Sequence, residues 1–128
     1  MAESSFGQNR GEPLNHSEFH ILLALADEQR HGYGIMQEVA QRSAGTVRLG
    51  PGTLYGAIRR MLSAGLIEES SDRPSVEQDD QRRRCYYRLT PTGREAAAAE
   101  TRRLAALVRL AESKRLVDSA ILSHEGAR

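Results

Sequence analysis

A long run of helix-favouring sequence in the second half of the chain constrains its fold more than any other feature. The run begins at Thr90, is rich in alanine at its start, and continues through leucine, valine and isoleucine to about Leu122. It predicts one helix of about 32 residues, which is roughly 48 Å long at 1.5 Å per residue. Because the whole chain has only 128 residues, a single small domain cannot cover a helix of this length.

The apolar residues of this predicted helix occupy more than one narrow stripe. Part of the helix surface is therefore expected to pack against something outside the chain. We predict that residues 91–128 form a C-terminal dimerisation helix and that the chain is a homodimer. The predicted interface residues are Leu104, Leu107, Val108, Ala111, Val117 and Ile121.

Residues 14–90 are predicted to form one domain, preceded by a mobile tail. The tail, residues 1–13, is rich in glycine, serine, asparagine and glutamine, and this composition cannot offset the entropy of ordering. The first helix of the domain is expected to begin after Asn15, which forms a capping box with Glu18. Its apolar spacing predicts an end near Glu28.

Two further helices are delimited by glycine and proline. The second helix follows the break around Tyr33, which lies between two glycines, and is expected to end near Gly45. The third begins with Pro51, where the missing N–H costs nothing, and ends at Gly65, which supplies a left-handed stop. Its predicted buried stripe consists of Leu54, Ile58, Met61 and Leu62.

Short strands complete the predicted domain. Alternating apolar residues predict a very short strand at 46–49, and residues 66–70 and 84–90 predict two strands joined by the polar loop 71–81. In the last strand Cys85 alternates with Tyr87 and Leu89, so we expect a small buried hydrophobe there rather than a redox-sensing thiol. The fold is therefore expected to be mainly α, as a winged helix-turn-helix whose wing is the hairpin.

Composition and spacing exclude several classes of function. No apolar run approaches the roughly 18 residues of a membrane span, and the first residues lack a signal-peptide pattern, so we expect a cytoplasmic protein with no membrane partner. One cysteine and the spacing of four histidines predict no metal site and no cofactor. No nucleophile elbow, phosphate loop or Ser/His/Asp order is discernible, so we expect no catalytic residues and no enzyme.

Charge is segregated along the chain although the net charge is only +1. Residues 42–66 hold four arginines and no acid, and residues 82–94 hold five arginines and no acid. Acidic residues gather instead in residues 1–29 and 67–81. Segregation of this kind is what phosphate binding requires, so double-stranded DNA is the predicted partner.

The third helix has the composition of a helix that reads DNA bases. With its apolar stripe turned inward, threonine, tyrosine and arginine face outward, and arginine can form a bidentate fork with guanine. The basic residues of the predicted wing would add contacts to the backbone. The predicted DNA-binding residues are Arg48, Thr53, Tyr55, Arg59, Arg60, Arg82, Arg83, Arg84 and Arg88.

Three segments resemble the PadR family of bacterial transcriptional regulators. They are HGYGI at 31–35, PGTLYGAIRRMLSAGLI at 51–67 and RRRCYYRLTPTGRE at 82–95. The resemblance implies a homodimeric winged-helix repressor of an inverted-repeat operator, in the subgroup with one dimerisation helix. It also implies recognition-helix roles for Thr53 and Tyr55, a basic wing strand with Arg83 and Arg84, and packing of the wing on the core through Tyr87 and Leu89.

The chain departs from this family in two places. Gly56 stands where the family often has proline, and the wing loop is acidic where a DNA-facing tip would be basic. The acidic residues of the loop are Asp72, Glu77, Asp79 and Asp80. The absence of tryptophan excludes a tryptophan-lined effector pocket, so a small-molecule effector stays an open question. The alternative function is a winged-helix module that binds another protein and not DNA.

Overall fold

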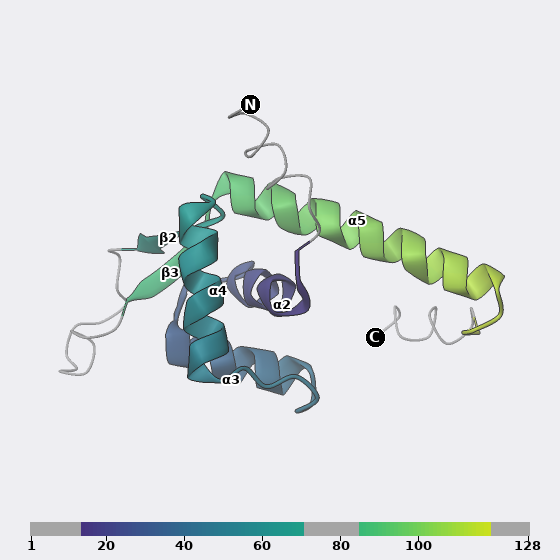
Figure 1. The fold of residues 1–128 in the computed structure, drawn as a ribbon, viewed down its shortest axis with the longest axis horizontal. Coiled ribbons are helices and arrows are strands. Elements are labelled where there is room, and N and C mark those ends of the chain that lie inside the picture. The colour runs from purple at the N-terminus through teal and green to yellow at the C-terminus, as the bar shows by residue number, and fades with distance from the viewer. Residues whose placement is uncertain (1–13, 71–84, 119–128) are drawn as a thin grey trace. The chain divides into compact units, whose positions relative to one another are not determined.

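The computed structural model describes residues 14–70 and 85–118, and it divides the chain into two compact units, Met1–Ala97 and Ala98–Arg128. The described elements are shown in Figure 1. In chain order they are α2 (His16–Leu25), β1 (Arg30–His31), α3 (Gly32–Arg42), α4 (Pro51–Ser63), β2 (Ile67–Ser70), β3 (Tyr86–Leu89) and α5 (Pro91–Ser113). The predicted tail, the predicted wing loop and residues 119–128 lie outside the described residues.

Helix α2 begins with the predicted capping box. The backbone N–H of Glu18 donates to Asn15 Oδ1 at 2.8 Å, and Asn15 N–H donates to Glu18 Oε1 at 3.1 Å. The helix ends at Leu25, before the predicted end near Glu28. Arg30 contributes to this early end, because its Nε donates to the carbonyl oxygen of Ala24 at 2.7 Å as the chain turns into β1.

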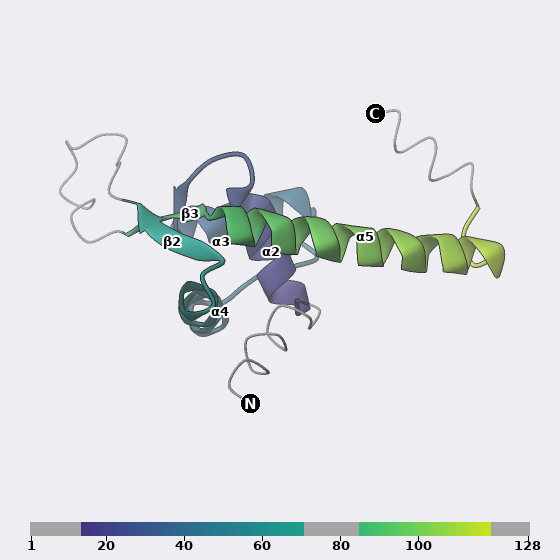
Figure 2. The same ribbon diagram turned by 90° about the horizontal axis from the view of Figure 1, so that it is seen from above.

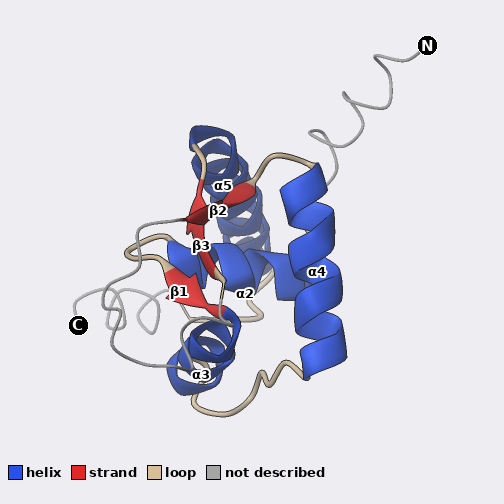
Figure 3. Ribbon diagram, turned by 90° about the vertical axis from the view of Figure 1, so that its left-hand side faces the viewer, coloured by secondary structure: helices blue, strands red, loops and turns tan. Residues whose placement is uncertain are grey.

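The short strand lies before α3, not after it, so the prediction of a strand at 46–49 is wrong. Strand β1 pairs antiparallel with β3, with His31 opposite Tyr86, and β2 pairs with the other edge of β3 (Figure 3). Residues 47–50 have no regular structure. Their apolar residues alternate because Leu49 is buried and Val47 packs on the core. The backbone N–H of Val47 donates to Ser43 Oγ at 2.9 Å and not to a neighbouring strand.

Helices α3 and α4 both end in left-handed turns. Ala44 and Gly45 have φ of 54° and 81° after α3, and Gly65 has φ of 76° after α4. Leu66 N–H donates back to the carbonyl oxygen of Met61 at 2.9 Å. This bond confirms the predicted stop at Gly65.

The core lies where α2, α3 and α4 meet the sheet, and Figure 2 views α4 nearly along its axis beside α2. Helix α2 contributes Ile21 and Leu22, and α4 contributes Leu54, Ile58 and Met61, all fully buried. The inward stripe predicted for the third helix is therefore confirmed at these three positions, and Leu62 packs against the core at its edge.

Helix α5 starts where Thr90 caps it. Gly93 N–H donates to Thr90 Oγ1 at 2.9 Å, and the Thr90 hydroxyl donates to the carbonyl oxygen of Gly65 at 2.6 Å. Gly93 itself is required by packing, because an added Cβ would overlap the carbonyl group of Leu66, at 2.8 Å from its carbon atom. The cap therefore ties the start of α5 to the turn after α4.

The predicted end of the last helix near Leu122 is wrong. Helix α5 has 23 residues and ends at Ser113. Arg115 adopts a left-handed φ of 63°, and Leu116 N–H donates to the carbonyl oxygen of Ala111 at 3.0 Å, which closes the helix as a glycine would. Among the described residues, no helix is long and apolar enough to cross a membrane.

Candidate nucleic-acid interface

The outward face of α4 carries the side chains that the sequence analysis selected. Thr53, Tyr55, Arg59 and Arg60 are exposed, while the intervening apolar residues are buried in the core. Gly50 caps the helix without a side-chain bond, and Pro51 occupies its first turn. The amphipathic pattern of this sequence thus presents polar and basic groups along one side of a helix that the core holds rigidly.

Tyr55 is partly exposed, and it also packs against the start of α3. Its side chain is 40% exposed, and its ring lies against Gly32, where an added Cβ would be 2.7 Å from the Cζ atom. Gly32 is buried. The close approach of the tyrosine to the glycine backbone therefore fixes the spacing between α3 and α4.

Tyr87 lies beside this contact in β3. The pKa of Tyr87 is raised to about 12, chiefly by burial and in addition by the Cys85 thiol, the Glu69 carboxylate and Tyr55. Tyr87 and Leu89 pack on the core as the resemblance implied. The expectation that Cys85 is buried is wrong: Cys85 is exposed and precedes β3, whose Tyr86 and Tyr87 are both buried.

Arg59 and Arg60 differ although they are adjacent on α4. Arg60 Nε donates to Glu18 Oε2 at 3.2 Å, and the Glu18 side chain is only 15% exposed. Glu18 also completes the cap of α2, so this ion pair joins the end of α4 to the start of α2. Arg59 is exposed.

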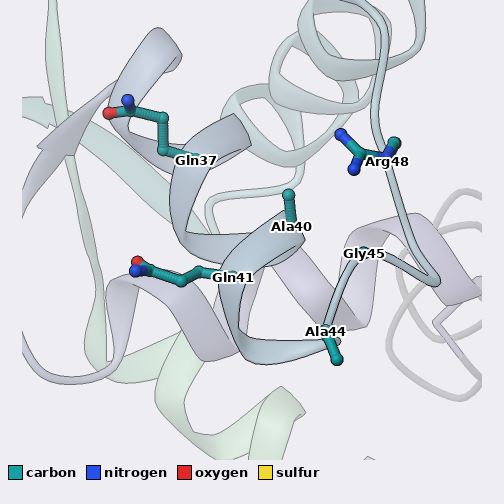
Figure 4. A pocket seen from close by; sticks show the side chains of 6 residues that line it. All are labelled: Gln37, Ala40, Gln41, Ala44, Gly45 and Arg48. Atoms are coloured by element: carbon teal, nitrogen blue, oxygen red, sulfur yellow. The ribbon is translucent and has the colours of Figure 1, made fainter.

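The remaining basic residues are distributed over other elements. Arg88 of β3 donates through Nε to Glu68 Oε2 of β2 at 2.8 Å across the hairpin. Arg48 lies apart from the α4 face, in the segment between α3 and α4, where it lines a surface hollow (Figure 4). Arg82, Arg83 and Arg84 lie outside the described residues.

Apolar side chains are exposed along α5 and just after it. Leu107 is 48% exposed, Val108 is exposed, and Leu104 and Ala111 are half-buried. Val117 is exposed but follows the end of the helix, and Ile121 lies outside the described residues. Leu110 and Leu116, which the predicted interface omitted, are exposed as well. Leu110 lies within α5, and Leu116 follows its end.

Histidines hold structural positions in the described part of the chain. His31 caps α3, because its Nδ1 accepts the Gly34 N–H at 3.1 Å, and its ring contacts Tyr86 edge-on. The rings of His16 and His20 are 4.6 Å apart, and burial followed by the charge of His16 lowers the pKa of His20. No group of three or more metal-ligating side chains occurs among the described residues.

Three exposed uncharged residues on α3 are not among the residues predicted from the sequence. Tyr33 is 57% exposed in the first turn, and Gln37 and Gln41 are exposed further along the helix. The predicted DNA-binding residues follow the basic segments and the outward face of the third helix, so they include none from α3. The spacing of Tyr33, Gln37 and Gln41 on one exposed side of the helix before α4 could have identified them.

Helices α2, α3 and α4, a three-stranded antiparallel sheet and an exposed polar face on α4 define a winged helix-turn-helix protein. The chain belongs to the transcriptional regulator PadR-like family, whose model matches residues 21–99. Members of this family are transcriptional regulators, and the chain is therefore a transcriptional regulator and not an enzyme.

Two related sequences support this assignment. The chain is 38% identical over 90 residues to the transcriptional regulator Rv3488 of Mycobacterium tuberculosis. This match covers 70% of this chain and 77% of that protein. It is 39% identical over 107 residues to a 37.1 kDa protein in transposon TN4556 of Streptomyces fradiae. That match covers 84% of this chain but only 27% of the length of the transposon protein.

Solved structures share the fold. A PadR family transcription regulator from Clostridium difficile R20291 has a TM-score of 0.64 at 27% identity, over 77% of this chain and 97% of that chain. Bacillus subtilis PadR in complex with operator DNA has a TM-score of 0.55 at 15% identity, over 66% of this chain and 46% of that chain. The second likeness concerns the fold alone.

Proposed function

We propose that this chain is a sequence-specific DNA-binding repressor that acts in the cytoplasm as a homodimer on an inverted-repeat operator. The observation that carries the proposal is the outward face of α4, where Thr53, Tyr55 and Arg59 are exposed on a helix anchored by buried apolar residues. No acid interrupts residues 42–66. A rigid helix with this face suits insertion into the major groove.

The homodimer is supported by the exposed apolar side chains of α5. Leucine and valine at this density are unusual on the surface of a monomer. A two-fold axis through this region would present two copies of α4 to two half-sites. Half-sites one helical turn or a multiple of it apart follow from this symmetry. Residues 91–128 are accordingly the proposed dimerisation element, and release by a small-molecule effector is the proposed mode of regulation.

Selection of bound fragments from genomic DNA, followed by footprinting, tests the proposal. We expect enrichment of one inverted repeat and a footprint that is symmetric about its centre. Thr53→Glu, which places a carboxylate at the N-terminal end of α4, should abolish the enrichment, because that end of a recognition helix contacts base edges. Ser63→Glu adds the same charge at the other end of α4, where Ser63 is exposed, and should largely retain it.

Failure to enrich any sequence, with both variants behaving like the unaltered chain, would contradict DNA recognition by α4. Binding of a partner protein through the same face would then favour the alternative function, a winged-helix module that does not use DNA.

A further inference from the structure

A surface hollow lies between the C-terminal half of α3 and the segment that leads into α4. Its volume is about 580 Å³, and Figure 4 shows the side chains around it. The lining residues are Gln37, Ala40, Gln41, Ala44, Gly45 and Arg48. Two alanines and a glycine leave the floor open, and the amide and guanidinium groups supply every polar side chain of the lining.

The chemistry of this lining suits an anion. A guanidinium has five N–H donors and each amide has two, whereas no carboxylate lines the hollow. Within the described parts of the chain, Arg48 forms no ion pair, and the nearby Glu38 binds Arg30 and Arg42. The positive charge of Arg48 is thus available to a ligand.

The turn that carries Arg48 is held in place by its own hydrogen bonds. The Thr46 hydroxyl donates to the Ser43 carbonyl oxygen at 2.7 Å, and Val47 N–H donates to Ser43 Oγ at 2.9 Å. Arg48 Nη2 would be 3.3 Å from a Cβ at Gly45, so the guanidinium lies back over the turn toward α3 (Figure 4). Little backbone conformational entropy is then lost in this turn when a ligand binds.

We propose that Gln37, Gln41 and Arg48 form a binding site for one phosphate group of the DNA backbone. The inference rests on the proposed function, since Arg48 stands three residues before α4 and the helix that precedes a recognition helix crosses the backbone. The site fixes the position of α4 on the duplex and carries no base information. Tetrahedral oxygens would accept hydrogen bonds from the arginine and from both amides.

Binding to a short random-sequence duplex, measured over a range of salt concentrations, tests this site without knowledge of the operator. Arg48→Ala should weaken binding about tenfold at low salt and lower the slope of log K against log salt by about 1. The ratio of the affinity of the unaltered chain to that of Arg48→Ala should therefore fall about threefold to fourfold between about 50 and 200 mM salt. Gln41→Leu should weaken binding and leave the slope unchanged, because a neutral amide releases no counterion.

Arg42→Ala is the matched control. It removes the same charge from the end of α3, but Arg42 binds Glu38 through its Nε at 2.6 Å and does not line the hollow. We expect little change in its affinity or slope. Circular dichroism should show unchanged helix content for all three variants, since each substituted residue is exposed.

The possible outcomes separate the two proposals. If the unaltered chain binds no duplex, DNA recognition and this phosphate site both fail. If it binds and Arg48→Ala has the same slope and affinity as Arg42→Ala, the phosphate site alone is overturned. If Arg48→Ala loses helix content, Gln41→Leu decides: unchanged affinity overturns the site, and weakened affinity at an unchanged slope supports it.

Discussion

Gly93 allows the first turn of α5 to pack against the turn after α4, because a side-chain methyl group at this position would overlap the backbone of Leu66. It is buried where the first turn of α5 crosses the backbone of Leu66. Gly93→Ala must separate α5 from the turn after α4, and we expect a loss of about 3 kcal/mol in the free energy of unfolding. Urea denaturation measures this loss. Gly52→Ala is the control, since no atom lies within 4 Å of an added Cβ at Gly52 and alanine favours the helix.

The two adjacent arginines of α4 should contribute unequally to DNA binding. Arg59→Ala should cost about 1 to 3 kcal/mol on the operator and relax the preference at one base pair, as a lost bidentate contact would. Arg60→Ala should cost less, because Arg60 exchanges its bond to Glu18 for a bond to DNA. Binding to operator variants with single base changes measures both effects. Equal losses on every sequence for both variants would show that α4 does not read bases.

The phenol of Tyr87 should make stability depend on pH in the alkaline range. Its pKa rises from a usual value of 10.0 to about 12 in the folded chain, so the unfolded chain releases the proton first. The neutral phenol therefore stabilises the fold fully below about pH 10, and this contribution is lost as the pH rises through about 12. Thermal unfolding of Tyr87→Phe should lack this part of the alkaline decline. A decline identical to that of the unaltered chain would contradict the shift.

At the scale of elements, the sequence around the start of α5 contains two residues that could serve as its N-cap. Thr90 precedes Pro91, and Thr92 precedes Glu95 at capping-box spacing. The structure uses Thr90, which also bonds the Gly65 carbonyl oxygen. Tertiary contact selects this cap, because a helix begun two residues later would lose the bond to the turn after α4.

Thr90→Ala should therefore reduce the free energy of unfolding by about 1 kcal/mol or somewhat more, since it removes a helix cap. Thr92→Ala at the adjacent exposed position should change it by less than about 0.5 kcal/mol. Chemical denaturation of both variants measures the difference. Equal effects would contradict the assignment of Thr90 as the cap.

At the scale of the whole molecule, the exposed apolar residues of α5 should hold two chains together. Deletion of residues 104–128 should yield a monomer in sedimentation and weaken operator binding far more than non-specific binding, because two half-sites are no longer held together. Leu107→Lys combined with Leu110→Lys should do the same without truncation, since both side chains are exposed. Ala99→Lys, at an exposed position before this cluster, is the control. A truncated chain that stays dimeric would refute this interface.

Local signals in the sequence determined most of the elements. The capping box at Asn15, the proline at the start of α4 and the left-handed stop at Gly65 each act within one turn of a helix, so their chemistry can be identified without neighbours. The buried stripe of α4 followed from its period in the same way. These signals sufficed to predict the order of the helices, the starts of α2 and α4, the hairpin strands and the exposed face of α4.

Tertiary structure decided what depends on partners distant in sequence. Alternation at 46–49 resembles a strand, but a strand needs a neighbour, and β3 offers that edge to Arg30 and His31 instead. Arg60 carries the same charge as Arg59, and only packing brings Glu18 within 3.2 Å of it. Cys85 alternates with inward residues but lies before the strand begins. The sequence by itself determines interactions between residues that are close along the chain, such as helix caps. Contacts between residues distant in the sequence determine which strands pair and which charged side chains form ion pairs.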